Sequence, residues 1–527
     1  MGTQLTINEA SKFATEFTGR TITESNISYL IQYGRIDRIN KDGTSFVSKE
    51  QLIDYYTSSK GKREIAWKDK LGQDTNWRLS FDTYTEAETT KHVHRLHPYK
   101  GKYIPQLVEY FLDDHTDEFK TQVYFNRGDI VLDPFCGSGT TLVEANELGM
   151  NCIGIDISSF NAQISNVKIR NYNIEHLQLL IDKITQKLEE FEKDSNTSSF
   201  ENALLAELYT FNSEFFPSPE FRKRVFENEV NEKEYGTQKE VEFLPIYQRL
   251  AQQYNISLDT SDSSFMEKWY FPTTRKEIRY LNSLINMIDD NDEKEIIQVI
   301  LSRTMRSCRA TTHSDLATLL EPVYTTYYCR KHKKICKPLF SIVKWWKTYS
   351  KDTINRLLEF QKIKTDTFQR CYAADSTTFS IDTALMLEGG EIAEQYLKNK
   401  IKGIFCSPPY VGLIDYHEQH AYAYELFGMP RCDNDEIGSM KKGYNRTAQE
   451  EYVESIVQVL LNCKKYLSND YEVFIVANDK YGLYEEIAKQ AGMQIVERFK
   501  RPVLNRTEKD KSAYSEMIFR MKEAHHE

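Results

Sequence analysis

The sequence predicts an α/β protein in which helices cover a parallel sheet, with a mainly helical insertion and a small N-terminal module. Short apolar strands alternate with helices from about residue 113 to residue 175. The same alternation returns from residue 366 to the C-terminal end. Strands that alternate with helices form parallel sheets with both faces buried. A long helical stretch between the two segments predicts the insertion.

The first sixty residues predict a small unit of their own. Thr6 and Glu9 have the spacing of a capping box, which begins a helix. A second helix ends at Gly34, and Lys41-Asp42-Gly43 is a turn signal between two short strands. Ser48 begins a third helix. This order resembles the winged helix-turn-helix modules of excisionase-like and MerR-like DNA binders, and a helical protein-interaction cap is the alternative.

The α/β part of the chain is divided into residues 61–175 and 366–527, on either side of a helical block at residues 176–365. The expected strands are short apolar runs at residues 130–133, 151–156, 369–375, 402–407, 472–479, 493–499 and 514–521. Within the helical block, Thr274 and Glu277 predict a capping box that begins a helix.

Composition indicates a soluble globular protein of two to three domains. The chain has 527 residues, of which 40% are hydrophobic and 28% are charged. We see no secretory signal and no apolar run long enough to span a membrane. Nine scattered cysteines fit a reducing cytosol better than a disulfide framework. We therefore expect a cytoplasmic protein with no membrane partner.

One stretch is strongly basic although the net charge of the chain is −10. Residues 322–351 contain eight Lys or Arg and no Asp or Glu. Aromatic residues lie among them, including Tyr324, Tyr327, Tyr328, Trp345 and Trp346. Such a surface can neutralise phosphates and stack on bases, and a solvated basic face is an equally good interpretation. Basic residues at 440–447 and 499–519 are further candidate DNA contacts, or exposed loops.

A glycine turn after the first expected strand predicts a small-ligand site. Gly137 and Gly139 lack a Cβ atom, so the backbone can adopt positive φ and approach a ligand closely. No Gly-Lys-[Ser/Thr] follows, which excludes a phosphate-binding P-loop. Asp156 ends the next strand, where an acidic side chain accepts hydrogen bonds from ribose hydroxyls. The pattern favours a nucleoside cofactor without a polyphosphate, and a turn built only for packing is the alternative.

A stiff corner ends another strand, at Ser407-Pro408-Pro409-Tyr410. Neither proline can extend a sheet ladder. Together with Asp-Pro-Phe-x-Gly-x-Gly at residues 133–139, this corner resembles the amino-methyltransferases of DNA that use S-adenosylmethionine. The Ser-Pro-Pro-Tyr form is similar to the N4-cytosine branch of that family. The resemblance covers about residues 85–175 and 366–527.

The resemblance implies a Rossmann-like S-adenosylmethionine-dependent methyltransferase fold, with S-adenosyl-L-methionine as cofactor. It implies double-stranded DNA as substrate and a cognate restriction endonuclease as a candidate partner. The implied cofactor-binding residues are Lys102, Tyr103, Pro105, Asp133, Pro134, Phe135, Gly137, Gly139, Thr140, Asp156 and Asp375. Among them, residues 102–105 match a segment that helps hold the methionine part, and Asp375 matches the acidic residue that pairs with the adenine amino group. The implied catalytic residues are Ser407, Pro408, Pro409 and Tyr410.

The chain departs from the family's pattern in one respect. Some 270 residues separate the cofactor motif from the corner, and the insertion falls before the third strand. This departure leaves open which segment recognises the target sequence. It does not change the expected reaction.

The corner suits methyl transfer to an aromatic amine. Cytosine's exocyclic amine is a poor nucleophile because its lone pair is delocalised into the ring. Hydrogen bonds from the amine to the Ser407 hydroxyl oxygen and the Pro408 carbonyl would localise that lone pair, and Pro409 would keep the carbonyl aimed. Tyr410 would stack on a base flipped out of the duplex.

We therefore predict a site-specific DNA methyltransferase acting on cytosine N4, encoded by a bacterium or phage as the modification partner of a restriction system. The helical block would recognise the target, and the N-terminal module would add DNA contacts. The alternatives are a DNA adenine-N6 methyltransferase, an RNA guanine-N2 methyltransferase and a DNA-binding regulator that has lost catalysis.

Two groups of His and Cys residues are candidate metal ligands. A zinc site could be assembled from Cys308, His313, Cys329, His332 and Cys336. Their spacings do not match Cys-x-x-Cys knuckles, so we interpret them as packing cysteines and phosphate-facing histidines. The second group is His92, His94 and His97, in a stretch that the family resemblance explains without a metal. We predict no metal ion.

Overall fold

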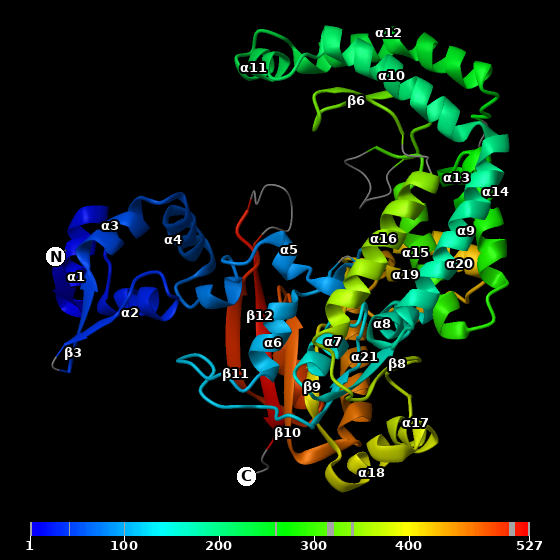
Figure 1. Ribbon diagram of the computed structural model, residues 1–527. Helices are drawn as coiled ribbons and strands as arrows, with labels where there is room; N and C mark the ends of the chain where they lie inside the picture. The colour runs from blue at the N-terminus through cyan, green and yellow to red at the C-terminus, as the bar shows by residue number, and fades with distance from the viewer. Residues whose placement is uncertain are drawn as a thin grey trace.

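A computed structural model describes residues 3–41, 43–99, 101–258, 261–312, 321–338, 342–504 and 512–524. Figure 1 shows a sheet with helices on both sides, an arm of long helices and a small N-terminal module. None of the helices in these ranges combines the length and apolarity that crossing a membrane requires.

The largest sheet in the described residues has seven strands in the order β11-β12-β10-β9-β4-β5-β8. Their bounds are β4 (Ile130–Asp133), β5 (Asn151–Asp156), β8 (Gln369–Ala373), β9 (Ile401–Cys406), β10 (Leu467–Ala477), β11 (Met493–Pro502) and β12 (Ser515–Glu523). Strands β8, β5, β4, β9 and β10 run parallel, whereas β12 is antiparallel to both β10 and β11. All seven expected strands are confirmed. The tip of the β11–β12 connection, residues 505–511, lies outside the described residues.

The direction of winding reverses between β4 and β9. The chain runs outward from β4 to β5 and β8, and then returns to the other side of β4 to form β9 and β10. Connections that diverge from two neighbouring parallel strands leave a crevice at their carboxyl ends. Leu132 pairs with Ile404, so the two sequence motifs begin at the same edge of the sheet.

Both faces of the sheet are buried, as predicted. Alternate strand residues enter two different cores: Val131 and Phe405 face one, and Leu132 and Ile404 face the other. The first core contains α6 (Pro105–Leu112), α7 (Thr140–Glu147) and α8 (Ser159–Ile169). The second contains α17 (Ile381–Glu388), α18 (Gly390–Asn399), α21 (Arg446–Lys464) and α22 (Tyr484–Gln490).

The segment between α8 and β8 is mainly helical. Its elements are α9 (Ile174–Ser195), α10 (Thr197–Phe215), α11 (Glu220–Phe226), α12 (Glu232–Gln253), α13 (Phe265–Trp269), α14 (Pro272–Asn286), α15 (Asn291–Ser307), the hairpin of β6 (Tyr327–Cys329) and β7 (Lys334–Cys336), and α16 (Ile342–Gln361). The predicted start of α14 at Thr274 is wrong. Pro272 occupies the first turn of that helix, where its missing N–H is no loss, so the helix begins there.

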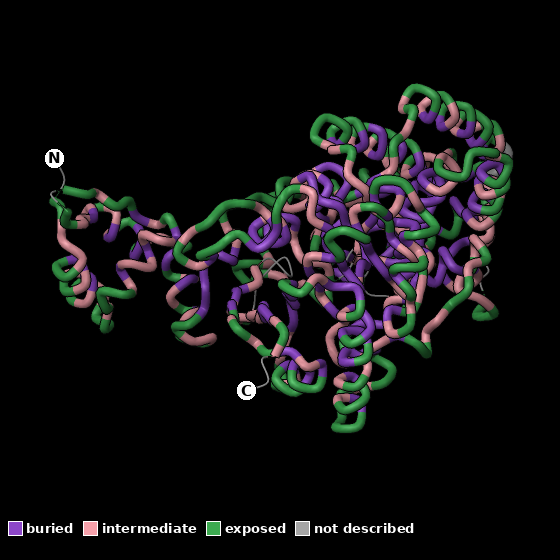
Figure 2. Tube along the Cα trace, turned by 90° about the horizontal axis from the view of Figure 1, so that it is seen from below, coloured by how far each residue is buried: buried purple, intermediate pink, exposed green. Residues whose placement is uncertain are grey.

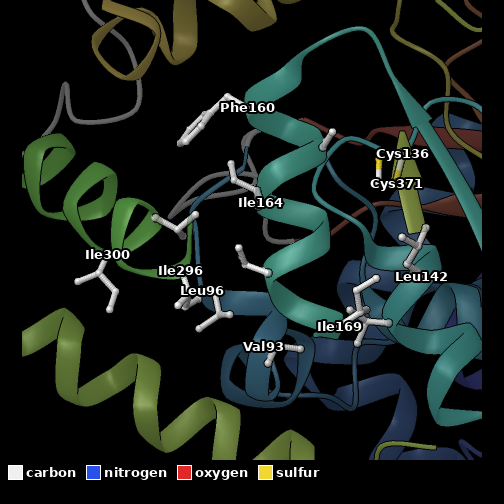
Figure 3. Packing of buried hydrophobic residues seen from close by; sticks show 14 of the residues in the cluster. Val93, Leu96, Cys136, Leu142, Phe160, Ile164, Ile169, Ile296, Ile300 and Cys371 are labelled. Carbon is white, nitrogen blue, oxygen red and sulfur yellow. The ribbon is translucent and has the colours of Figure 1, made fainter. Parts of the chain in front are cut away.

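The helices of this segment pack into two separate cores. Helices α9, α14, α15 and α16 share the core of α8, and Figure 3 shows Phe160 and Ile164 on the side of α8 that is turned to Ile296 of α15. Helices α10 and α12 form another core with the β6–β7 hairpin, through residues such as Tyr247 and Ile335. The base of the segment is therefore continuous with the α/β body, and the α10–α12 arm has its own apolar centre.

The N-terminal module forms a small core beside the main body (Figures 1 and 2). It contains β1 (Gln4–Thr6), α1 (Ile7–Thr18), α2 (Glu24–Gln32), β2 (Ile39–Lys41), β3 (Thr44–Ser48), α3 (Lys49–Thr57) and α4 (Ser59–Leu71). The Thr6–Glu9 capping box is confirmed, and Gly34 has the positive φ of +63° expected beyond a helix end. Strand β1 was not predicted, and Asp42 of the predicted turn lies outside the described residues. An ion pair of 2.8 Å between Arg35 and Asp82 joins the module to the segment that follows it.

Short helices complete the body. These are η1 (Trp77–Ser80), α5 (Glu86–Thr89), η2 (His92–Arg95), α19 (Tyr416–Gln419), α20 (Ala421–Phe427), η3 (Asp433–Asp435) and η4 (Met440–Lys442).

Candidate active site

A cavity at the carboxyl ends of β4, β5 and β9 brings the two sequence motifs together. It holds about 890 Å³ of space, part of which is open to solvent. Its wall includes these predicted site residues: Lys102, Tyr103, Pro134, Phe135, Gly137, Thr140, Asp156, Asp375, Ser407 and Pro409. Five predicted residues are not in that wall: Pro105, Asp133, Gly139, Pro408 and Tyr410.

Close packing explains the two glycines of the turn between β4 and α7. Gly137 has a φ of +52°, and a Cβ atom on it would lie 3.1 Å from the ring of Tyr99. Gly139 has a φ of +75°, and its Cβ would lie 2.9 Å from the Cβ of Ser165 on α8. Because neither residue carries a side chain, the turn can fold tightly between the cavity and α8.

Asp156, the last residue of β5, fixes the backbone of the glycine turn through hydrogen bonds. Its Oδ2 accepts a hydrogen bond of 2.8 Å from the Gly137 N–H, and its Oδ1 accepts one of 2.8 Å from the Ser158 N–H. Burial raises the pKa of the Asp156 carboxyl to about 6 although these hydrogen bonds favour the ionised form. At neutral pH the group is a carboxylate, and it can accept further hydrogen bonds from a ligand in the cavity.

Asp133 lies beneath the turn and supports it. Its Oδ2 accepts hydrogen bonds from the hydroxyls of Tyr103, at 3.1 Å, and Thr141, at 2.7 Å, while its Oδ1 accepts one of 3.1 Å from the Phe135 N–H. Burial raises the pKa of Asp133 to about 6. Pro105 is buried at the first position of α6. Asp133 therefore fixes the turn from outside the cavity, and Pro105 lies in the core at the start of α6.

Lys102 and Asp375, the first and last of the predicted cofactor-binding residues, lie in different environments. Lys102 donates a hydrogen bond of 2.7 Å from Nζ to the carbonyl of His94, and burial lowers its pKa to about 8. Asp375 is exposed, and its Oδ1 accepts hydrogen bonds of 2.8 Å from both the N–H and the hydroxyl of Thr377. Lys102 is thus held by the protein, whereas Asp375 stands at the open rim.

The corner after β9 presents two of its four residues to the cavity. Ser407 and Pro409 are half-buried and line it, while Pro408 is buried. Tyr410 turns toward β12, where its hydroxyl donates a hydrogen bond of 2.8 Å to Glu516. Burial, together with the nearby charge of Glu516, raises the pKa of the Tyr410 hydroxyl well above its usual value.

Several wall residues were missed by the sequence reasoning. Tyr99 and Tyr416 stack with their ring centroids 5.7 Å apart. Tyr99 lies just before residues 102–105, and Tyr416 lies just after the corner. Their positions beside predicted site residues could therefore have marked these aromatic side chains. Asn161 and Glu436 also line the cavity. No local pattern marks Glu436, whose role depends on contacts with the N–H groups of a helix twenty residues away.

The three clustered histidines divide into two environments. His92 and His94 lie 3.0 Å and 2.7 Å from Glu147 and Glu144, respectively, and both rings are buried. His97 lies elsewhere, with its Nε2 atom 2.9 Å from the hydroxyl of Ser302. Each ring therefore has at least one polar contact in the protein interior, and the Nδ1 atoms of His92 and His94 make no hydrogen bond to a described residue.

The cavity fits a nucleoside-containing cofactor. The buried Ser138 Oγ and Asn161 Oδ1 make no hydrogen bond to any described residue, and both residues line the cavity. The Asp156 carboxylate and the adjacent turn backbone supply further polar groups beside the apolar ring of Phe135. Hydroxyl and amide acceptors beside an aromatic wall match a ribose and an aromatic base.

Comparison with known proteins decides the family. The family described as "DNA methylase" matches residues 16–167, and the family described as "RMKL-like, methyltransferase domain" matches residues 123–244. The type II methyltransferase M.MjaII of Methanocaldococcus jannaschii is 44% identical over 522 residues, which are 98% of this chain and 96% of that protein. The chain belongs to the DNA methyltransferase family.

Two shorter similarities cover only part of this methyltransferase. The type II methyltransferase M.MvaI of Kocuria varians is 32% identical over 100 residues, 19% of this chain and 21% of that protein. A tRNA (guanine(10)-N2)-dimethyltransferase of M. jannaschii is 37% identical over 71 residues, 13% of this chain and 20% of that protein. The sheet order agrees with a Rossmann-like methyltransferase fold, and the methyl donor is S-adenosyl-L-methionine.

Proposed function

We propose that this methyltransferase modifies the N4 amino group of cytosine in duplex DNA, with the base flipped out of the helix. One observation carries the proposal: Ser407 and Pro409 line the same cavity as Gly137 and Asp156. A donor seated at the turn would then be within reach of an amine held at the corner. The Ser-Pro-Pro-Tyr form of that corner favours cytosine over adenine.

Each residue of the corner has a distinct task in this proposal. S-adenosylmethionine, when bound, supplies an activated sulfonium methyl group. Ser407 accepts a hydrogen bond from the target amine through its hydroxyl oxygen, and Pro408 accepts a second one through its carbonyl. The rigid ring of Pro409 keeps that carbonyl in place, so the acceptors need no reorganisation during the reaction. Tyr410 stacks on the extruded base, and stacking of ~1–3 kcal/mol offsets part of the flipping cost.

The cofactor side of the site binds and orients the donor. Asp156 accepts hydrogen bonds from the ribose hydroxyls, and Asp375 pairs with the adenine amino group. Lys102, Tyr103 and Pro105 support the methionine part. Correct alignment of donor and amine can supply ~7–11 kcal/mol of the barrier, so no strong general base is required.

The remaining segments would bring the DNA to the cavity. We propose that the helical block at 176–365 recognises the target sequence, with the basic residues of 322–351 on the phosphates, and that the N-terminal module at 1–60 adds DNA contacts. The relatives named as type II methyltransferases support a place in a restriction–modification system. A cognate restriction endonuclease would then be the functional partner.

Nucleoside analysis tests the proposed target. The protein is incubated with duplex DNA and S-adenosylmethionine labelled in the methyl group, and the DNA is hydrolysed and separated by chromatography. We expect the label in N4-methylcytosine. Label in N6-methyladenine would replace cytosine by adenine as the target, and transfer only to RNA would overturn the proposal.

A further inference from the structure

The β6–β7 hairpin of the helical block gathers two thiols and an imidazole. Cys329 ends β6, Cys336 ends β7, and His332 lies in the turn that joins the strands. The strands pair antiparallel, with Tyr327 opposite Cys336 and Cys329 opposite Lys334. Cys329 and Cys336 are 3% and 7% exposed, so both thiols are shielded from solvent.

The distances within this group are those of metal ligands. The Nδ1 atom of His332 lies 3.5 Å from the Sγ of Cys329 and 3.5 Å from the Sγ of Cys336. One ligand atom from each residue lies within 4.8 Å of the others. Zn–S bonds of about 2.3 Å and Zn–N bonds of about 2.05 Å at a tetrahedral angle place N and S about 3.5 Å apart. Both nitrogen–sulfur distances therefore match those of a zinc tetrahedron, and the two sulfur atoms lie within 4.8 Å of each other.

We propose that Cys329, His332 and Cys336 bind one zinc ion. The two cysteines bind as thiolates and the histidine through neutral Nδ1, so binding releases one proton from each thiol and changes no oxidation state. A water molecule or a further residue completes the four-coordinate shell. The spacing Cys-x-x-His-x-x-x-Cys does not contain a Cys-x-x-Cys pair, which is why the sequence alone favoured packing cysteines. His313 lies outside the described residues, and Cys308 is buried in the core of α15 and its neighbours.

A zinc ion would add to the stability of the hairpin. Its strands are three residues each, and a hairpin this short is marginally stable by itself. Asn212 of α10 holds the backbone of Ile335 with two hydrogen bonds of 2.9 Å, and Glu240 of α12 accepts one of 2.9 Å from the Tyr328 N–H. In the turn, Lys333 donates a hydrogen bond of 2.5 Å from Nζ to Glu232 of α12. A zinc ion held by the turn and both strand ends would fix the turn as well.

The zinc ion would order a basic tip. Arg330, Lys331 and Lys334 are exposed in and beside the turn. Positive charge near the site also favours the thiolate form of its cysteines, which bind the metal. The inference concerns metal binding only, so it does not rest on methyl transfer to cytosine.

The first experiment measures zinc in the full-length protein. The chain is purified, incubated with zinc sulfate, freed of unbound metal and analysed for zinc. We expect one ion per wild-type chain, and loss of that ion from the variants Cys336→Ser and His332→Ala. Cys432→Ser is the matched control, because it removes a cysteine from a different surface, and it should keep the ion. No retained zinc in the folded wild type, or equal retention in Cys336→Ser, would overturn the proposal.

A second experiment needs no variant and so does not depend on how variants fold. The wild-type protein is alkylated with iodoacetamide, with zinc bound or after chelation, and the modified cysteines are mapped by mass spectrometry. We expect chelation to expose Cys329 and Cys336 to alkylation and to leave buried Cys463 unchanged. Replacement of zinc by cobalt should give the absorption of thiolate-bound cobalt. A Cys329–Cys336 disulfide in the native protein, or alkylation that ignores zinc, would overturn the assignment.

Discussion

The hydroxyl of Tyr410 donates a hydrogen bond of 2.8 Å to the carboxylate of Glu516, across 106 residues of sequence. This bond joins the corner after β9 to β12. Arg501 of β11 lies 3.7 Å from the other oxygen of Glu516. The carboxylate is therefore placed between a neutral hydroxyl and a cation, and it fixes the direction of the Tyr410 ring.

We predict that Tyr410 and Glu516 contribute to stability as a pair. Tyr410→Phe leaves the half-buried Glu516 carboxylate without its hydroxyl donor. Glu516→Gln weakens the acceptor and removes the negative charge that faces Arg501. A double-mutant cycle on the free energy of unfolding should give a coupling of about 0.5–3 kcal/mol. Tyr471→Phe, which removes a hydroxyl bound to Glu523 at another place on β10 and β12, is the control. Additive effects of Tyr410→Phe and Glu516→Gln would show that the bond does not hold the corner.

Cofactor affinity should depend on pH through Asp156. Its pKa is raised to about 6 by burial, so below that pH the carboxyl is protonated and loses its capacity to accept ribose hydroxyls. Because hydroxyl donors stabilise the ionised form, binding lowers the pKa of Asp156. By linkage, affinity for S-adenosylmethionine should rise with pH up to about 6 and then level off.

Asp156→Asn isolates this effect. The asparagine keeps the size of the side chain but removes its charge, and loss of charged hydrogen bonds of about 1.5–3 kcal/mol corresponds to roughly tenfold to hundredfold weaker binding at neutral pH. Calorimetry at several pH values measures both predictions. Exposed Asp382→Asn is the control. A wild-type pH profile that persists in Asp156→Asn would assign the titration to another group, such as Asp133, whose pKa is also about 6.

Gly139→Ala should destabilise the protein more than a comparable glycine substitution. The positive φ alone costs ~1–2 kcal/mol, and the contact of the new Cβ with Ser165 should add ~1–3 kcal/mol. Gly428→Ala is the matched control, because Gly428 has a φ of +66° but no described atom within 4 Å of the added Cβ. Thermal unfolding measures the difference. Equal losses in the two variants would mean that the turn does not pack tightly on α8.

The basic tip of the β6–β7 hairpin should contribute to DNA affinity. The double variant Lys331→Ala and Lys334→Ala loses two phosphate contacts. The negative slope of log affinity against log salt concentration should therefore become less steep, by about 1.8. The double variant Lys398→Ala and Lys489→Ala removes the same charge from α18 and α22, away from the hairpin. Titration of labelled duplex DNA at several salt concentrations compares them. Similar slopes for the two variants would exclude the tip from the DNA interface.

Local patterns explain what the sequence predicted well. The apolar runs of the seven strands and the glycines after β4 are encoded within a few residues, so their positions could be predicted. The parallel arrangement then places Asp156 and Ser407 at the same edge of one sheet. Their presence in a single cavity follows from that topology.

Long-range contacts explain what the sequence did not predict. Glu516 and Glu436 act through partners that no spacing rule connects to them. The start of α14 was misplaced because a plausible capping pair lay just inside a helix that Pro272 begins. The ligand-like spacing of Cys329, His332 and Cys336 depends on how β6 pairs with β7, which their separation along the chain does not reveal.

Single-turnover methylation by the Ser407→Ala variant tests most directly whether the corner presents the amine to the donor. Loss of one preorganised hydrogen-bond partner should slow methyl transfer on the order of 10²–10³-fold, while affinity for duplex DNA stays close to that of the wild type. Ser380→Ala, at the exposed start of α17, should retain full activity. A Ser407→Ala variant that methylates DNA at the wild-type rate would contradict the account.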